Sequence, residues 1–93
     1  MPKFEMRNQS LIISGALDID SIETLYKKLD QIKNLPVNEI IFQDINDVHL
    51  AAIQLLISFK KSFASKISYK IIDTKFQEIL LLTGLNQYLS EES

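Results

Sequence analysis

Carboxylates and a single histidine are the side chains in this sequence that could hold a metal ion or transfer a proton. Asp18 and Asp20 lie in one polar stretch, and Asp44 and Asp47 lie in a second one. Four carboxylates gathered at one end of a sheet could bind Mg²⁺ or Ca²⁺ through their oxygens. Asp20 and Asp47 also precede predicted helices, where an aspartate commonly caps the first turn. We expect this capping role for Asp20 and Asp47, and no metal at the four carboxylates.

The histidine, His49, is expected at the start of a helix, where the positive end of the helix dipole disfavours an imidazolium. We therefore expect a neutral histidine that caps the helix or lies on the surface. The alternatives are a phosphohistidine and a proton sensor, because histidine is the residue type that changes charge near neutral pH.

The remaining composition excludes several classes of function. The chain has no cysteine and one histidine, which excludes disulfides, thiolate nucleophiles, cysteine-based zinc or iron–sulfur sites and a two-histidine zinc motif. It has no glycine-rich phosphate loop, and no nucleophile or oxyanion-hole motif accompanies the carboxylates. The formal net charge of −2 gives no electrostatic footprint for nucleic acid. We expect a protein that is not an enzyme and that binds neither a cofactor nor nucleic acid.

Length and composition indicate one folded domain over residues 1–93. The 46% hydrophobic and 24% charged residues are sufficient for a core of that size. Glu91 and Glu92 make residues 90–93 an acidic, solvated tail. The first residues lack the apolar segment of a signal peptide, and no apolar run approaches the roughly 18 residues of a membrane span. We expect a cytoplasmic protein without direct membrane insertion.

The first third of the chain predicts two strands and a helix. Residues 4–7 alternate apolar and polar side chains, and the apolar run 11–13 follows a polar turn, so the two segments fit a β-hairpin. Gly15 is expected to end the second strand. Asp20 and Glu23 have the spacing of a capping box at the start of a helix. The helix is expected to end at Asn34-Leu35-Pro36, and its apolar stripe consists of Ile22, Leu25, Leu29 and Ile32.

The rest of the chain predicts a strand over 39–43, a polar turn over 44–47 and a helix over about 50–65. A strand over 67–72 and a helix over 75–82 follow; Asp73 or Thr74 caps this helix, and Gly84 ends it. The order is β-β-α-β-α-β-α. Helices between consecutive strands predict right-handed crossovers. We therefore expect an α/β fold with a four-stranded mixed sheet, parallel apart from its antiparallel start.

Residues 40–59 resemble the signature segment of the STAS family, which comprises anti-sigma-factor antagonists, their bacterial relatives and the cytosolic tails of sulfate transporters. The helix sequence Ala51-Ala52-Ile53-Gln54-Leu55-Leu56 is similar to the family's helix. Gly15 with Leu17 resembles its Gly-x-Leu element, and Thr83-Gly84-Leu85 resembles its closing Gly-Leu. The predicted order of elements agrees with the family along essentially the whole chain.

The resemblance also shows a departure. Counting back from Ala51, the family's phosphorylated Ser or Thr corresponds to Leu50, and the Asp before it corresponds to His49. Leucine has no oxygen that could accept a phosphoryl group. The nearest hydroxyl in the helix, Ser58, lies about two turns further on. We therefore expect no phosphorylation switch at the family position, so that a partner is bound constitutively or is controlled in another way.

The second helix carries more apolar side chains than a single stripe requires. Gln54, Ser58, Lys61 and Ser65 form a narrow polar face, while Leu50, Ile53, Ile57 and Ala64 widen the apolar side. Either neighbouring helices cover this flank, or Leu50, Ile53 and Ile57 form an exposed patch that binds a partner or a second copy of the chain. The resemblance implies a partner-binding surface at this helix and the turn before it: Asp47, His49, Leu50, Ile53, Gln54 and Ile57.

Two functions follow from the resemblance. The first is a non-catalytic, protein-binding regulatory module that is similar to anti-sigma-factor antagonists and binds a kinase-like anti-sigma factor. The alternative is a small STAS subunit of a lipid-transporting ABC system, which binds the transporter's ATPase. The sequence alone does not distinguish the two.

Overall fold

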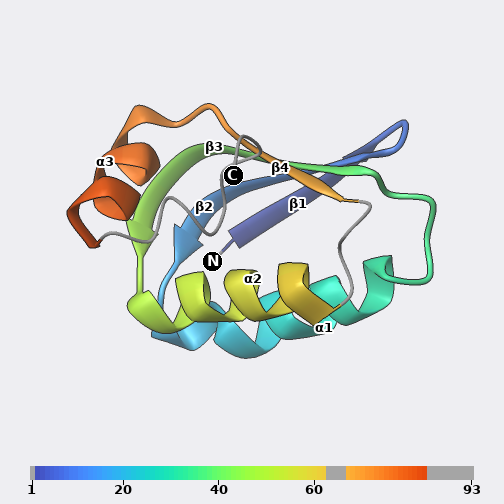
Figure 1. The fold of residues 1–93 in the computed structure, drawn as a ribbon, viewed down its shortest axis with the longest axis horizontal. Helices are drawn as coiled ribbons and strands as arrows, with labels where there is room; N and C mark the ends of the chain where they lie inside the picture. The colour runs from blue at the N-terminus through green and yellow to red at the C-terminus, as the bar shows by residue number, and fades with distance from the viewer. Residues whose placement is uncertain (1, 63–66, 84–93) are drawn as a thin grey trace.

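The computed structural model describes residues 2–62 and 67–83. The elements follow the predicted order, with a short 3₁₀ turn before the first helix (Figure 1). Their bounds are β1 (Pro2–Arg7), β2 (Ser10–Leu17), η1 (Ile19–Ser21), α1 (Ile22–Ile32), β3 (Glu39–Val48), α2 (Leu50–Ser62), β4 (Ser68–Ile71) and α3 (Thr74–Thr83).

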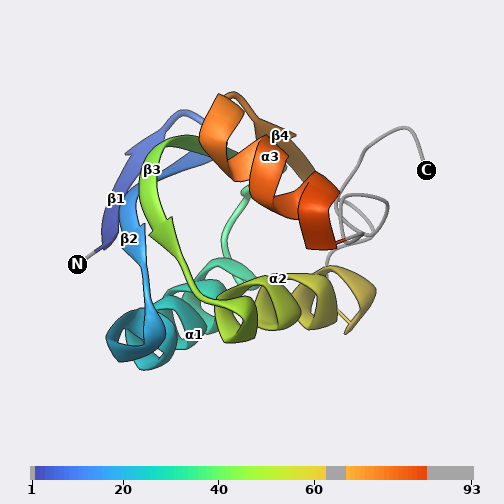
Figure 2. The same ribbon diagram turned by 90° about the vertical axis from the view of Figure 1, so that its left-hand side faces the viewer.

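The four strands form one mixed sheet in the order β1-β2-β3-β4. β1 and β2 pair antiparallel as a hairpin, whereas β2 with β3 and β3 with β4 pair parallel. The connections from β2 to β3 and from β3 to β4 each lead to the neighbouring strand, in the same direction along the sheet. Right-handed connections therefore place α1 and α2 on the same face of the sheet. Both helices lie side by side beneath the sheet in the two views (Figures 1 and 2). The predicted α/β fold with a four-stranded mixed sheet is confirmed.

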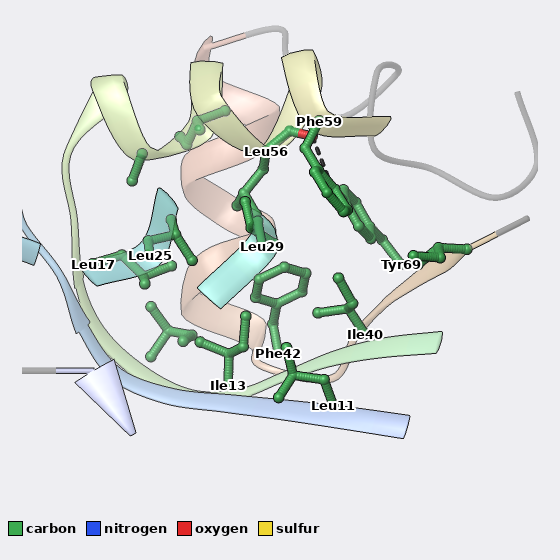
Figure 3. Packing of buried hydrophobic residues seen from close by; sticks show 14 of the residues in the cluster. Leu11, Ile13, Leu17, Leu25, Leu29, Ile40, Phe42, Leu56, Phe59 and Tyr69 are labelled. Atoms are coloured by element: carbon green, nitrogen blue, oxygen red, sulfur yellow. Dashed lines mark hydrogen bonds between the residues drawn. The ribbon is translucent and has the colours of Figure 1, made fainter. Parts of the chain in front are cut away.

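The core lies between the sheet and the helices, and the Phe42 ring is near its centre (Figure 3). The rings of Tyr69 and Phe76 meet Phe42 edge-on, with centroids 5.6 Å and 5.3 Å away. Phe76 therefore joins α3 to the same core that α1 and α2 cover. The buried Tyr69 hydroxyl donates a hydrogen bond to the carbonyl of Leu56, 2.9 Å away, so this polar group is satisfied inside the apolar layer. The predicted stripe of α1 is confirmed, since Leu25, Leu29 and Ile32 are buried and Ile22 is half-buried against the core.

Two predictions about strand ends were wrong. Gly15 does not end β2, which continues to Leu17, and residues 44–47 are not a turn but part of β3, which continues to Val48. The two extensions pair with each other, because Gly15 is opposite Ile45 and Leu17 is opposite Val48. The register shifts on both sides of Gly15, whose φ is 93°. Glycine reaches this conformation without steric cost, so it accommodates a bulge where a strand end was expected.

The start of α1 also differs from the prediction. No capping box forms, because the helix begins after η1 with Ser21 as its cap residue and without a side-chain capping bond. Ser21 is buried, and its hydroxyl donates a hydrogen bond to the Asp18 carboxylate, 2.6 Å away. The carboxylate that accepts a hydrogen bond in this segment is therefore that of Asp18 and not that of Asp20, whose side chain lies in solvent.

α3 begins as predicted. Asp73 caps it by accepting the backbone N–H of Phe76, 3.1 Å away. The predicted end of this helix at Gly84 and the extension of the second helix to Ser65 lie outside the described residues. Among the described residues, no helix is long and apolar enough to span a membrane.

Candidate functional site

The surface where β2 and β3 end is the part of the molecule at which the predicted site residues meet. Leu17 and Val48, the last residues of the two strands, are opposite each other in the parallel register. Two residues further on, η1 begins with Ile19 and α2 begins with Leu50. Parallel strands end at the same edge of a sheet, so the starts of η1 and α2 lie side by side (Figures 1 and 2). Both side chains are large, apolar and in solvent, with exposed fractions of 63% and 49%.

His49 fixes the start of α2. Its backbone N–H donates to the carbonyl of Leu17 at 2.7 Å, and its carbonyl accepts the N–H of Ala52 at 2.9 Å, the first bond of the helix. Its imidazole Nδ1 accepts the backbone N–H of Ala51 at 3.0 Å. The structure therefore places the histidine in the expected capping position.

Leu50 is the first residue of α2, directly after this cap. The backbone N–H groups at a helix start and the positive end of the dipole favour an anion there. The first turn of α2 contains no acidic residue, and Leu50 itself offers neither a hydroxyl nor a carboxylate. The side chain presented at this point is a hydrocarbon.

The rest of the predicted partner-binding set divides between surface and core. Gln54 is exposed and Ile57 is half-buried against the core cluster, and both line a shallow hollow along α2 together with Ser58 and Lys61. Ile53 is only 1% exposed. The prediction that Ile53 belongs to an exposed patch with Leu50 and Ile57 is therefore wrong. Ile53 packs inward because it lies on the side of α2 that faces the sheet.

The four aspartates do not converge. In the part of the chain that the structure describes, no three histidine or carboxylate side chains are grouped closely enough to hold a metal ion. The pKa of Asp18 is lowered, mainly because its carboxylate accepts the Ser21 hydroxyl. Asp20, Asp44 and Asp47 are exposed. Asp44 has a φ of 51°, a left-handed conformation that aspartate tolerates better than most residues.

Comparison with solved structures identifies the fold. The chain is similar to an anti-sigma factor antagonist from Mycobacterium paratuberculosis, with a TM-score of 0.72 and 11% identity over 94% of this chain and 80% of the other. It is also similar to the anti-sigma factor antagonist SpoIIAA in its unphosphorylated form, with a TM-score of 0.67 and 14% identity over 88% of this chain and 83% of the other. The chain has the STAS fold of the anti-sigma factor antagonists.

At these identities the likeness concerns the fold alone. No protein-family model matches the sequence, and no curated protein matches it either. The fold that the sequence resemblance implied is confirmed by the shape of the chain, although the sequence differs from those of the two structures at most positions.

Within this STAS fold, the exposed Ile19 was not predicted from the sequence as part of the site. The residue lies between Asp18 and Asp20, so it appeared to be part of a polar loop before the helix. A signal was available: Ile19 is an isolated apolar residue two positions after the end of a strand, as Leu50 is. Its position near the start of α2 follows from the common end of β2 and β3, where Leu17 is opposite Val48.

A second feature that the sequence did not indicate is a groove between α1 and α2. Its floor is apolar, with Leu29, Leu55 and Phe59, and Tyr26, 57% exposed, lies along it. Its other lining residues are Asp30, Lys33 and Ser58, and the Lys33 ammonium lies 2.7 Å from the Asp30 carboxylate. This pair raises the pKa of Lys33. Of the apolar side chains along the groove, Leu29 and Phe59 are buried, and Leu55 is half-buried.

Proposed function

We propose that this chain is a non-catalytic STAS module that binds a regulatory protein through the surface where β2 and β3 end. We call this the α2-start surface; it consists of Ile19, Asp47, His49, Leu50, Gln54 and Ile57. The observation that carries the proposal is the exposure of Leu50 at the first position of α2, beside the exposed Ile19.

Physical reasons support a binding role for these two side chains. Burying a leucine or isoleucine side chain is worth about 1.5–3 kcal/mol relative to leaving it in water. Leu50 and Ile19 leave much of that free energy unused in the folded chain, since each is close to half or more exposed. Neighbouring exposed apolar side chains with a polar rim are typical of protein-binding surfaces. Here Asp47, His49 and Gln54 supply the rim, and all three are exposed.

The proposal includes the absence of a phosphorylation switch at the start of α2. A phosphoryl group at a helix N-terminus would add about two negative charges to an apolar contact and meet unpaired N–H groups. Leu50 cannot carry such a group, and the hydroxyl of Ser58 lies about two turns along the helix. Binding at this surface is therefore constitutive unless another device controls it. Incubation with ATP and a cognate kinase, followed by intact-mass measurement and peptide mapping, tests this point; a phosphoryl adduct at His49 or at a serine of α2 would contradict it.

Capture from an extract of the source organism tests the binding role. The wild-type chain, the Leu50→Asp variant and the Leu82→Asp variant are each immobilised, and retained proteins are identified by mass spectrometry. Leu82 is the matched control because it is 87% exposed and lies on α3, which contributes no residue to the α2-start surface. The proposal predicts a specific protein that is lost with Leu50→Asp and kept with Leu82→Asp. Equal retention by both variants would contradict it.

The identity of the retained protein distinguishes the two partner classes considered from the sequence. A kinase-like anti-sigma factor supports the regulatory module that we propose. A transporter ATPase would instead assign the chain to a lipid-transporting ABC system, with the same surface in use.

A further inference from the structure

β1 forms one edge of the sheet, and in the described part of the chain no strand pairs with its outer side (Figure 2). It spans six residues, whereas β4, the strand at the opposite edge, spans four. An unpaired edge presents backbone N–H and C=O groups that a further strand can bind. β1 is therefore the longer of the two edges on which the sheet could be extended.

The hairpin determines which backbone groups of β1 point outward. Arg7 and Ser10 are paired and flank the two-residue turn 8–9, so they exchange backbone hydrogen bonds. Hydrogen-bonded and non-hydrogen-bonded positions alternate along an antiparallel pair. The odd-numbered residues of β1 consequently bond to β2, and the backbone groups of Phe4 and Met6 point away from the sheet.

The side chains of β1 divide between two faces. Lys3, Glu5 and Arg7 share the face turned away from the helices, and all three are exposed. Phe4 and Met6 share the helix-covered face, because their partners on β2 are core residues. Phe4 is half-buried there and Met6 is 42% exposed, so apolar surface remains at the edge.

We propose that a second copy of the chain adds its β1 antiparallel to this edge, with the two-fold axis at Phe4, so that the two sheets become continuous. In this register the two Phe4 residues exchange their backbone hydrogen bonds. The Met6 N–H of each copy donates to the Pro2 carbonyl of the other. Proline acts only as an acceptor in this bond, so its lack of a backbone N–H does not prevent the pairing. Lys3 of each copy lies opposite Glu5 of the other.

Charge and the length of the strand together select this register. Opposite charges that face each other across a strand pair stabilise it, and like charges destabilise it. With the axis at Glu5, the two Glu5 carboxylates would face each other and Lys3 would face Arg7, so every charged pair would repel. With the axis at Met6, Phe4 would face Asn8, whose φ of 58° belongs to the turn and not to a strand. The axis at Phe4 is the symmetric register that overlaps the strands and opposes unlike charges.

The proposed contact is separate from the α2-start surface, because β2 lies between β1 and β3. A dimer formed through β1 would leave Leu50 and Ile19 free, so the inference does not depend on the proposed function. The occupant is a second copy because the charge pattern of this strand is complementary to itself.

A charge-swap series tests the inference by sedimentation equilibrium over a wide concentration range. Wild type is expected to form dimers whose dissociation constant rises with salt. Lys3→Glu and Glu5→Lys should each weaken association by on the order of tenfold or more, since two attractive pairs become repulsive. The double variant Lys3→Glu/Glu5→Lys should associate more strongly than either single variant, because each unlike pair between the copies is formed again with its charges exchanged. It should remain weaker than wild type, since Glu5→Lys also removes the ion pair of Glu5 with Arg7 of the same strand, 2.6 Å long.

Other results would overturn the inference. A wild-type chain that remains monomeric at millimolar concentration would do so, as would a double variant that associates no more strongly than the single variants. Stronger association of Lys3→Glu would indicate the register with the axis at Glu5, where the introduced carboxylate would meet Arg7. Leu50→Asp serves as the control: it should dimerise like wild type, and its loss of dimers would place the contact at the α2-start surface instead. Circular dichroism of each variant verifies that all are folded.

Discussion

The Asp73 carboxylate accepts the backbone N–H of Ile45 at 2.5 Å, which joins the start of α3 to β3 just beyond the last residue of β3 that pairs with β4. The other oxygen of the same carboxylate accepts the N–H of Phe76 and caps α3. One side chain therefore satisfies a strand-edge donor and a helix-start donor together. This connection holds α3 against the sheet at the point where its Phe76 ring meets Phe42.

Asp73→Ala is expected to lower the free energy of unfolding by about 1–3 kcal/mol, because it removes a helix cap and leaves the Ile45 N–H without its acceptor. Urea unfolding followed by circular dichroism measures the change. Asp20→Ala is the matched control, since that side chain is exposed, and it should change stability by less than about 0.5 kcal/mol. Equal effects of the two substitutions would contradict the role of Asp73.

Tyr69→Phe is expected to cost about 1 kcal/mol near neutral pH, since it removes the hydroxyl that bonds the Leu56 carbonyl in the core. Burial also raises the pKa of Tyr69. Because the folded-state pKa exceeds the unfolded one, the associated stability is fully present below about pH 10, the ordinary tyrosine value, and is lost as pH rises further. Unfolding free energies of wild type should therefore fall above this pH, and those of Tyr69→Phe should fall less. Parallel curves for both chains would contradict the assignment.

The hydrogen bond from the Ser21 hydroxyl to the Asp18 carboxylate leads to a prediction for the stability of the chain at acidic pH. The pKa of Asp18 is lowered mainly by this bond, so its contribution to stability is present above the ordinary aspartate pKa and is lost as pH falls through the folded-state value. Ser21→Ala should move the Asp18 pKa back toward its ordinary value. Titration of the Asp18 carboxyl carbon by NMR measures this directly. An unchanged titration midpoint in Ser21→Ala would mean that another group lowers the pKa.

His49 is an unusual choice for a helix cap, because Ser, Thr, Asp and Asn are the preferred residues at this position. His49→Asp should therefore stabilise the chain by up to about 1 kcal/mol, since a carboxylate accepts the helix-start N–H and interacts favourably with the dipole. His49→Ala should destabilise it by about 0.5–1 kcal/mol through loss of the bond to Ala51. The melting temperatures of the two variants, measured by thermal unfolding, test this order of stability. Greater stability of His49→Ala than of His49→Asp would contradict the capping role.

The sequence predicted those features that depend on local patterns. The spacing of Leu25, Leu29 and Ile32 was sufficient to predict α1 and its buried face. The position of Asp73 before an apolar helix was sufficient to predict the cap of α3. The strand ends were not predictable in this way. Residues 44–47 are polar and resemble a turn, but they extend β3 because β2 continues beside them past the bulge at Gly15.

The candidate site was predictable only in part for the same reason. The helical spacing of Ile53 and Ile57 placed them on a broad apolar side but could not show which of them neighbouring elements cover; the packing buries Ile53 and leaves Ile57 half-buried. Ile19 was missed because its relation to Leu50 depends on two strands that end together, which is a property of the sheet and not of either segment.

The most direct test of the central claim is the affinity of the captured partner for purified Leu50→Asp, measured by titration calorimetry beside wild type and Leu82→Asp. An aspartate in the first turn suits the helix dipole, so this substitution should change stability by less than about 1 kcal/mol and leave the fold intact. We predict binding that is at least roughly tenfold weaker for Leu50→Asp, in proportion to the loss of one buried leucine, and unchanged for Leu82→Asp. A dissociation constant for Leu50→Asp equal to that of wild type would contradict it.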